Sequence, residues 1–314
     1  MEKIPVGQLV RNRREAIGWS QERLSEGICS VSTLSRIENG ERMPSERVFQ
    51  ALMERLGLED VRVMVPQSPY DWDTENLWAE ARASVIHFNR AAEVEKPALR
   101  EEALACFREL EKAVEQDDLM IRQQIMGDKL ALGREDGPYP MEEKVALLLK
   151  AIQLTIPKFD LRRIGEFRYT MAETDLINQI GVAYTKGGEW ESALSIYRQL
   201  YTYLKENTPP TARYAGQRAM VATNYARGLN VCERYQRSID VAEEGRQFCV
   251  KYGRYQFLPQ LLAIQANCCA HLGDKEASQT FYDRAAFLYR EYGDTRNFDN
   301  LKQDAMDTLG IMLP

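Results

Sequence analysis

The sequence contains little histidine and none of the short motifs by which common enzyme classes are recognised. Its two histidines, His87 and His271, have no cysteines, aspartates or glutamates around them at the spacing of a metal site. We find no Walker loop, no G-x-G-x-x-G segment, no H-E-x-x-H helix and no G-x-S-x-G turn. We therefore expect no catalytic residue, no metal and no cofactor. Carboxylate pairs such as Glu142-Glu143 and Glu243-Glu244 are interpreted as exposed helix charge.

Long hydrophobic runs are also missing. No apolar run approaches the roughly 18 residues that a bilayer-spanning helix needs. The first residues, Met1 to Pro5, do not have the hydrophobic segment of a signal peptide. Hydrophobic residues make up 44% and charged residues 28% of the chain, as in ordinary soluble proteins. We expect a cytoplasmic protein.

The sequence has no C-x-x-C pair among its six cysteines. In a cytoplasmic chain, scattered thiols of this kind are expected to be reduced and mostly buried. The adjacent pair Cys268-Cys269 could in principle form a redox switch. Because neighbouring residues on a helix point about 100° apart, we favour different surroundings for the two thiols.

An excess of positive charge is absent as well, since the net charge is −6. This counts against a protein coated in nucleic acid. It does not exclude DNA binding, which requires clustered positive charge on one face of the molecule. Residues 1–60 are close to neutral, so such a face must come from the placement of charges and not from their number.

The stretch Ile17–Gly40 predicts two short helices joined by a tight turn at Gly27. Ser20 and Ser30 each precede one of these helices and are placed to cap it. An amphipathic helix from Val6 to Ile17 comes before them. Residues 5–60 therefore have the pattern of a compact unit of four or five short helices, with a helix-turn-helix suited to the major groove of DNA.

The second helix of this pair divides into a core face and an outward face. Leu34 and Ile37 lie three residues apart and must face the core. Small side chains at the start of the helix would let its backbone enter the groove, and Arg36 could form two hydrogen bonds to a guanine edge. Taken singly, each such residue could equally belong to a solvated helix face. The DNA-binding residues that we predict, including phosphate contacts, are Gln21, Ser30, Val31, Ser32, Ser35, Arg36, Asn39 and Arg42.

The segments S-Q-E-R-L and L-S-R-I-E-N-G-E-R-M-P-S, with the turn at Gly27 between them, resemble the repressor-type (XRE) helix-turn-helix of phage repressors and many bacterial regulators. The resemblance covers essentially all of residues 5–60. In that family an arginine late in the first helix pairs with the glutamate of the I-E-N-G segment. The resemblance therefore implies a structural pair of Arg14 with Glu38, which would fix the angle of the first helix.

Beyond this unit we predict a linker and then an uninterrupted series of helices. The helical pattern lapses around Pro66 and Pro69, so the expected divisions are a DNA-binding domain over 1–62, a linker over 63–75 and a repeat domain over 76–314. The alternative is that residues 63–75 form no linker and continue the helical structure by another route. The expected helices span about 75–93, 98–116, 118–132, 141–155, 170–187, 189–206, 212–230, 234–252, 256–272, 274–292 and 297–310. An all-α fold follows, with a tetratricopeptide-like α-solenoid after the helix-turn-helix.

The repeat itself is readable in the sequence. Ile177-x-x-Ile180-Gly181-x-x-Tyr184 and Ala193-x-x-x-Tyr197-x-x-Leu200 have tetratricopeptide spacing. A second unit holds Ala226, Leu229, Ser238, Ala242 and Gly245, and a third holds Ala266, Cys269, Gly273, Ser278, Tyr282 and Ala285. The units recur about every 40 to 45 residues, longer than the usual ~34. We expect about five helix pairs and a final capping helix.

The first helix of each pair should line the concave face of the stack. An asparagine side chain both donates to and accepts from one peptide unit, so a row of asparagines there could hold an extended peptide by its backbone. The alternative is that these asparagines are exposed or bonded to a neighbouring turn. The peptide-binding residues that we predict are Asn178, Thr185, Asn224, Arg227, Asn230, Asn267 and His271.

A helix-turn-helix followed by such repeats, with A-I-Q-L-T-I-P-K-F-D before M-A-E-T-D-L-I-N-Q-I-G-V-A-Y, resembles the Rgg/PlcR/PrgX (RRNPP) group of Gram-positive regulators. The resemblance covers nearly the whole chain. It implies a cytoplasmic homodimeric transcription factor whose repeat domain binds a short, imported signalling peptide. The dimer would bind a double-stranded, palindromic DNA operator. The related aspartyl phosphatases carry a helical bundle in place of the helix-turn-helix.

A different class of function stays open at this point. The repeats could serve a protein-interaction adaptor, or a regulator that senses a protein or a small molecule instead of a peptide. The acidic balance and the near-neutral first domain favour the adaptor. Because an adaptor would show no steep salt dependence of DNA affinity, that dependence separates the two classes.

Overall fold

The computed structural model describes residues 5–58, 68–135 and 137–313, and these residues contain helices and no β-strand. The all-α prediction is confirmed. The chain forms two compact units, residues 1–180 and 181–314, and each is described by itself. The division falls within helix α9 (Met171–Lys186), at Gly181.

The first unit begins with the helix-turn-helix. Its hydroxyl caps form as predicted, since Ser20 and Ser30 accept hydrogen bonds from the backbone N–H of Arg23 and Thr33 at 3.2 and 3.1 Å. Leu34 and Ile37 are buried in its core, on the face predicted for them. The four helices are α1 (Val6–Ala16), α2 (Gln21–Ser25), α3 (Val31–Glu38) and α4 (Glu46–Leu56).

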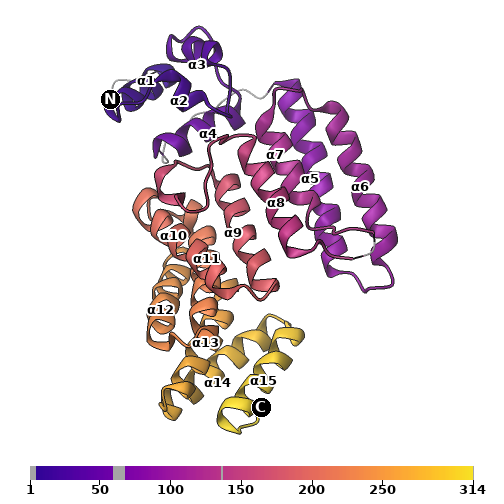
Figure 1. Ribbon diagram of the computed structural model, residues 1–314, viewed down its shortest axis with the longest axis vertical. Coiled ribbons are helices and arrows are strands. Elements are labelled where there is room, and N and C mark those ends of the chain that lie inside the picture. Colours follow the sequence, from indigo (N-terminus) through magenta and orange to yellow (C-terminus); the bar gives the residue numbers. More distant parts are fainter. Residues whose placement is uncertain (1–4, 59–67, 136, 314) are drawn as a thin grey trace. The chain divides into compact units, whose positions relative to one another are not determined.

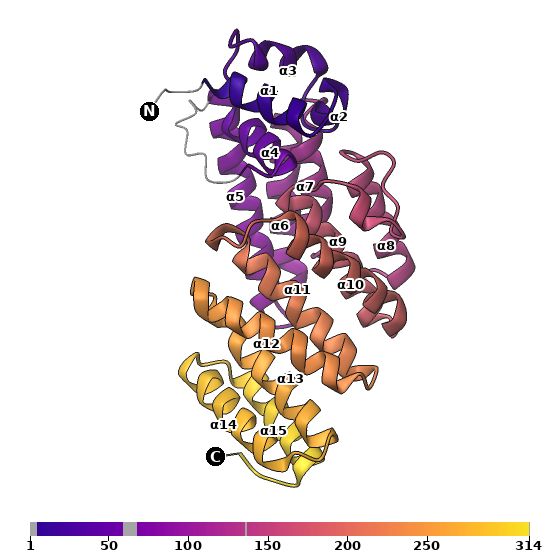
Figure 2. The same ribbon diagram turned by 90° about the vertical axis from the view of Figure 1, so that its left-hand side faces the viewer.

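The rest of the first unit is a layer of helices that lie side by side next to α4 (Figures 1 and 2). They are α5 (Pro69–Arg90), α6 (Lys96–Ala113), α7 (Leu119–Lys129), α8 (Met141–Gln153) and the first part of α9, with a short 3₁₀ turn at Ile164–Glu166. Residues 59–67, which include much of the predicted linker, lie outside the described residues.

The described part of the predicted linker is already helix. Helix α5 begins at Pro69, earlier than the pattern suggested, because Ser68 and Asp71 form a capping box. The Ser68 Oγ accepts from the Asp71 N–H at 3.1 Å, and the Asp71 carboxylate accepts from the Ser68 N–H at 3.4 Å. Proline at the first helical position favours this start, although in the sequence it was interpreted as a breaker.

The second unit stacks helix upon helix (Figure 2). Its helices are α10 (Trp190–Asn207), α11 (Ala212–Val231), α12 (Tyr235–Tyr252), α13 (Leu258–His271), α14 (Lys275–Glu291) and α15 (Thr295–Leu309), with a 3₁₀ turn at Tyr255–Phe257. Each helix packs against the next, and α13 also contacts α11 and α15. The first helices of successive pairs therefore share one face, as in a solenoid.

The same serine-to-carbonyl hydrogen bond occurs in two consecutive repeats. The Ser238 hydroxyl donates to the carbonyl of Ala226, and the Ser278 hydroxyl donates to the carbonyl of Ala266, both at 2.7 Å. The two bonds are related by a shift of 40 positions, and both serines are fully buried. The repeat predicted at about 40 to 45 residues is confirmed here by an identical contact in two consecutive units.

A glycine explains the closeness of α9 and α10. A Cβ atom on Gly181 would lie 2.5 Å from the ring of Tyr197, closer than real Cβ contacts allow. Tyr197 is 2% exposed and belongs to the core of the second unit. The glycine–tyrosine spacing of the sequence is therefore a packing requirement of this helix pair.

The cysteines are free thiols. Cys249, Cys268 and Cys269 are buried, and the other three are half-buried. Burial raises the pKa of Cys249 and Cys268 to about 11, so these thiols are protonated and unreactive at neutral pH. Among the described residues, no group of three or more cysteine, histidine or acidic side chains is arranged for a metal ion.

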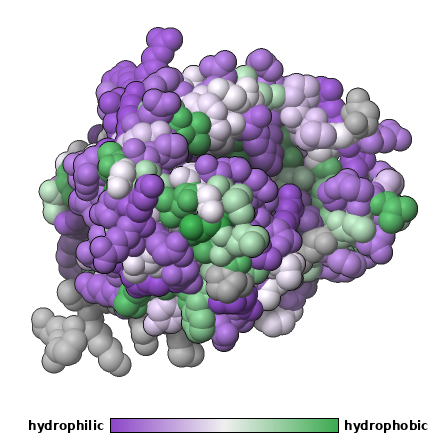
Figure 3. All heavy atoms as spheres, turned by 90° about the horizontal axis from the view of Figure 1, so that it is seen from below, coloured by the Kyte–Doolittle hydropathy of each residue, from purple (hydrophilic) through white to green (hydrophobic). Residues whose placement is uncertain are grey.

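Figure 3 shows a largely hydrophilic surface on which hydrophobic residues lie in separate patches. Exposed apolar side chains of the last helices include Phe287 and Met306. Within the described residues, no helix has both the length and the hydrophobicity needed to cross a bilayer.

Candidate functional site

The helix-turn-helix is organised around a buried ion pair between α1 and α3. Arg14 Nε donates to Glu38 Oε1 at 2.6 Å, and Arg14 Nη2 donates to Glu38 Oε2 at 2.8 Å. The third nitrogen, Nη1, donates to the Trp19 carbonyl at 2.8 Å. This is the pair that the repressor-type resemblance implied. It fixes α1 and the following turn against the last residue of α3.

Two further side chains from α1 and α2 approach the Glu38 carboxylate. The side chain of Gln21 donates to Glu38 Oε2 at 2.8 Å, and Arg11 lies 3.7 Å from the same oxygen. Burial alone would raise the pKa of Glu38, but the hydrogen bonds from Arg14 and Gln21 outweigh it and the pKa lies below its usual value. Because an amide nitrogen carries two hydrogens, one N–H of Gln21 remains available for a phosphate.

The outward face of α3 begins with small or apolar side chains and ends with arginine. Ser30 and Ser32 are exposed, with their hydroxyls 2.9 Å apart, and Val31 is 39% exposed. Ser35 is half-buried. Arg36 is exposed and makes no side-chain hydrogen bond or ion pair within the described part of the chain.

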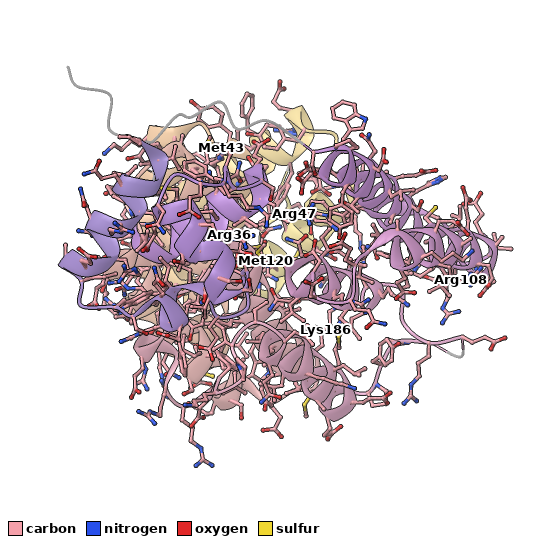
Figure 4. The ribbon with its side chains drawn as sticks, turned by 90° about the horizontal axis from the view of Figure 1, so that it is seen from above. Arg36, Met43, Arg47, Arg108, Met120 and Lys186 are labelled. Atoms are coloured by element: carbon pink, nitrogen blue, oxygen red, sulfur yellow. The ribbon has the colours of Figure 1, made fainter. Side chains whose placement is uncertain are left out.

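Figure 4 looks down on the helix-turn-helix and shows Arg36 on its upper side. Arg42 follows α3 and is exposed, and its backbone N–H donates to the Arg36 carbonyl at 3.2 Å. Asn39 is also exposed, but its amide is engaged by Arg11 and Glu41. The predicted DNA-binding residues thus lie together around α3, with Gln21 and Asn39 partly occupied by internal bonds.

The opposite side of the helix-turn-helix is docked on the helices that follow it in the first unit. Arg55 Nη2 of α4 donates to Glu173 Oε1 of α9 at 2.7 Å, and both side chains are buried. Glu173 also accepts from the Thr155 hydroxyl at 2.6 Å and from the Thr170 N–H at 2.7 Å. The turn at Gly27 lies against the backbone of Thr155. This contact leaves α3 on the outward side of the domain.

A cavity of about 320 Å³, lined by both polar and apolar side chains, opens in the second unit between α11, α13 and α15. It contains three of the predicted peptide-binding residues, namely Arg227, Asn230 and Asn267. Their shared position follows from the contacts of α13 with α11 and α15. The sequence did not single out the further polar residues of this cavity, which are Gln260, Asn297, Asn300 and Asp304.

The other four predicted peptide-binding residues lie elsewhere. Asn178 is 4% exposed and belongs to the first unit. Thr185 donates its hydroxyl to the Gly181 carbonyl at 3.0 Å within its own helix. His271 is exposed and stacks on Tyr235, with ring centroids 4.7 Å apart. Asn224 is half-buried on α11 and does not line the cavity.

Three of the four cavity residues that the sequence did not single out lie on the final helix, whereas Gln260 lies on α13. Asn297, Asn300 and Asp304 are spaced three and four apart on α15, so they share one face of that helix. The sequence pattern predicts a capping role for the final helix, and such a role gives no reason to expect a ligand-facing polar surface on it. The polar spacing at three and four was the signal that could have identified it.

Comparison with known proteins finds a family match for the amino-terminal part of the chain. The family model described as helix-turn-helix (HTH_3) matches residues 10–61. A search of curated proteins finds no significant match to the sequence. The matched residues include part of α1 and all of α2, α3 and α4, and so they contain both Arg14 and Glu38 and the outward face of α3.

Solved structures extend the similarity to the whole chain. The crystal structure of Bacillus thuringiensis PlcR in complex with the peptide PapR7 and DNA has a TM-score of 0.57 at 18% identity, covering 95% of this chain and 98% of PlcR. Apo PlcR gives 0.56 at 16% identity, covering 94% and 97%. ComR from S. thermophilus, in complex with DNA and its signalling peptide ComS, gives 0.48 at 15%, covering 98% and 100%. The chain therefore consists of an amino-terminal helix-turn-helix domain and a helical-repeat region, in the fold of PlcR.

Proposed function

We propose that this protein is a sequence-specific DNA-binding transcription regulator. The observation that carries the proposal is the outward face of α3, where small side chains precede an arginine without an internal partner among the described residues. Arginine is the side chain best suited to bind both acceptors of guanine in the major groove. The proposed base and phosphate contacts are Ser30, Val31, Ser32, Ser35, Arg36, Gln21, Asn39 and Arg42.

The regulator would bind as a homodimer to a palindromic operator. One α3 reaches only a few base pairs, and a domain without excess positive charge gains little affinity from phosphates alone. Two copies related by a two-fold axis would read half-sites separated by about one helical turn or a multiple of it. The protein would do this in the cytoplasm, and no catalysis is assigned to it.

We further propose that the repeat region binds a short signalling peptide. Support comes from the asparagine-lined cavity between α11, α13 and α15, since asparagine can satisfy both polar groups of a peptide unit. PlcR, which shares the fold, has been crystallised with a peptide and DNA together. A peptide could control DNA binding only if it has different affinities for two conformations of the protein.

Selection from a pool of random DNA duplexes, using the full chain, tests the DNA-binding proposal. We expect enrichment of a two-part sequence, and an affinity that falls steeply as salt rises from about 50 to 200 mM. Fluorescence anisotropy on the enriched duplex measures this slope. Absence of any enriched sequence, together with a flat salt dependence, would contradict the proposal and favour a protein-interaction adaptor.

A further inference from the structure

The cavity between α11, α13 and α15 contains one cation and one anion with very different surroundings. The carboxylate of Asp304 is well satisfied inside the protein: Oδ1 accepts from the Asn267 amide and Oδ2 accepts from the Tyr282 hydroxyl, both at 2.7 Å. The Tyr282 hydroxyl also lies 2.9 Å from that of Thr308. Asp304 is thus part of a fixed network that holds Asn267 in the cavity wall.

Arg227, the cation of the cavity, has no comparable partner. Among the described residues its guanidinium makes one hydrogen bond, to the neutral side chain of Gln260 at 3.5 Å, which is at the limit of such a bond. In the described residues no ion pair includes Arg227, and its side chain is exposed. A guanidinium carries five N–H donors in a planar fork, which matches the two oxygens of a carboxylate.

Neutral amides line the same cavity as this guanidinium. Asn230 lies three residues after Arg227, close to one turn along the same helix, and Asn297 and Asn300 contribute from α15. These amides can donate to an anion without neutralising the arginine. The volume of about 320 Å³ is at the lower end for ligand pockets, so it would accommodate part of a peptide and not its whole length.

We propose that the Arg227 end of this cavity binds a carboxylate of the signalling peptide, either its free carboxy terminus or an aspartate or glutamate side chain. The inference rests on the proposed peptide-binding function and adds the chemistry of one anchor. The guanidinium holds the carboxylate, and the asparagines bind the adjoining peptide unit. This contact fixes the bound peptide at one point, between α11 and α15.

The test uses two synthetic libraries of random heptapeptides, one with free carboxy termini and one with carboxy-terminal amides. Each is passed over the immobilised full chain, and the retained peptides are identified by mass spectrometry. We expect Arg227→Gln to lower the retention of carboxylate-bearing peptides about tenfold or more, because a charge-assisted bidentate contact is lost. Arg227→Lys, which keeps the charge without the fork, should retain part of the binding.

Arg284→Gln is the matched control, since Arg284 is exposed on α14, lies outside the cavity and undergoes the same change of charge. It should retain peptides as the unmodified chain does. Preference for the free-acid library assigns the carboxy terminus, whereas retained amides rich in aspartate or glutamate assign a side chain.

If the unmodified chain and Arg227→Gln retained all peptides equally, with or without a carboxylate, the carboxylate anchor would be overturned and peptide binding would remain intact. Retention of neither library would contradict peptide binding and the anchor together. The selection of DNA duplexes is independent of both results.

Discussion

Glu38 shows how one buried residue can organise the helix-turn-helix. Its side chain is fully buried, and it is tolerated there only because Arg14 and Gln21 supply hydrogen bonds to both carboxylate oxygens. The pairing of Arg14 with Glu38 was available from the sequence only through the family resemblance. No spacing rule connects residues of two different helices, so the bond from Gln21 was not predicted.

Replacement of Glu38 by glutamine should destabilise the first unit by about 3 kcal/mol, because it leaves the Arg14 guanidinium buried without its counter-charge. Urea unfolding followed by circular dichroism measures the change. Glu26→Gln, at an exposed position before the turn, is the control and should have little effect. A Glu38→Gln variant as stable as the unmodified chain would show that the Arg14–Glu38 pair does not stabilise the domain.

The contribution of the Glu38 carboxylate to the stability of the fold should fall as the pH is lowered. The pKa of Glu38 is lowered in the folded chain, so the folded state favours the charged carboxylate more than the unfolded state does. Its contribution is complete above the unfolded pKa of about 4.3 and is lost as the pH falls. The difference in unfolding free energy between the unmodified chain and Glu38→Gln should therefore shrink between about pH 5 and pH 3. A difference that stays constant over this range would rule out the charged pair as its source.

At the scale of elements, the sequence predicted the helices well and their contacts less well. The boundaries of α6 to α15 followed from apolar periodicity and from glycine or proline at the joints, because these features act locally. The start of α5 was missed, since a proline at a first helical position was interpreted as a breaker. The docking of α4 on α9 through Arg55 and Glu173 joins residues that are 118 positions apart, and no local pattern reports such a contact.

Glycine at position 181 is required by the packing of α9 against α10. Gly181→Ala should lower the stability of the second unit by about 1 to 2 kcal/mol, because the new methyl group meets the buried ring of Tyr197 and this cost exceeds the gain in helix propensity. Gly127→Ala is the matched comparison, since its Cβ would meet only the end of the flexible Leu176 side chain. Thermal unfolding should show the larger shift for Gly181→Ala. Equal shifts would mean that the ring adjusts as readily as the leucine.

The Arg55–Glu173 pair should hold the helix-turn-helix on the rest of the first unit. Arg55→Met leaves Glu173 buried without its cation and should cost about 3 kcal/mol or more. The double variant Arg55→Met/Glu173→Gln should recover part of this loss, since no buried charge then remains. Limited proteolysis around residues 59–67 and urea unfolding provide the two readouts. A double variant less stable than Arg55→Met would contradict the pairing.

At the scale of the whole molecule, the order of the parts was predictable from the sequence, but the cavity of the second unit was not. A repressor-type helix-turn-helix followed by tetratricopeptide spacing suffices to predict the PlcR fold. The cavity depends on which faces of α11, α13 and α15 meet, and this is decided by packing across repeats. The expectation that first helices line one face selected Arg227, Asn230 and Asn267, which do line this cavity. It gave no reason to select Asp304 and the asparagines of α15.

The outward face of α3 is proposed to bind DNA in a sequence-specific way, and Arg36→Ala tests this proposal most directly. The affinity of the full chain for its selected duplex, measured by fluorescence anisotropy at fixed salt, should fall about tenfold or more, with weaker discrimination at the guanine that Arg36 contacts. Arg108→Ala removes another exposed arginine, on α6 and away from the helix-turn-helix (Figure 4), and this variant should bind as the unmodified chain does. If Arg36→Ala retained the full affinity and the same sequence preference, α3 would not be the recognition helix.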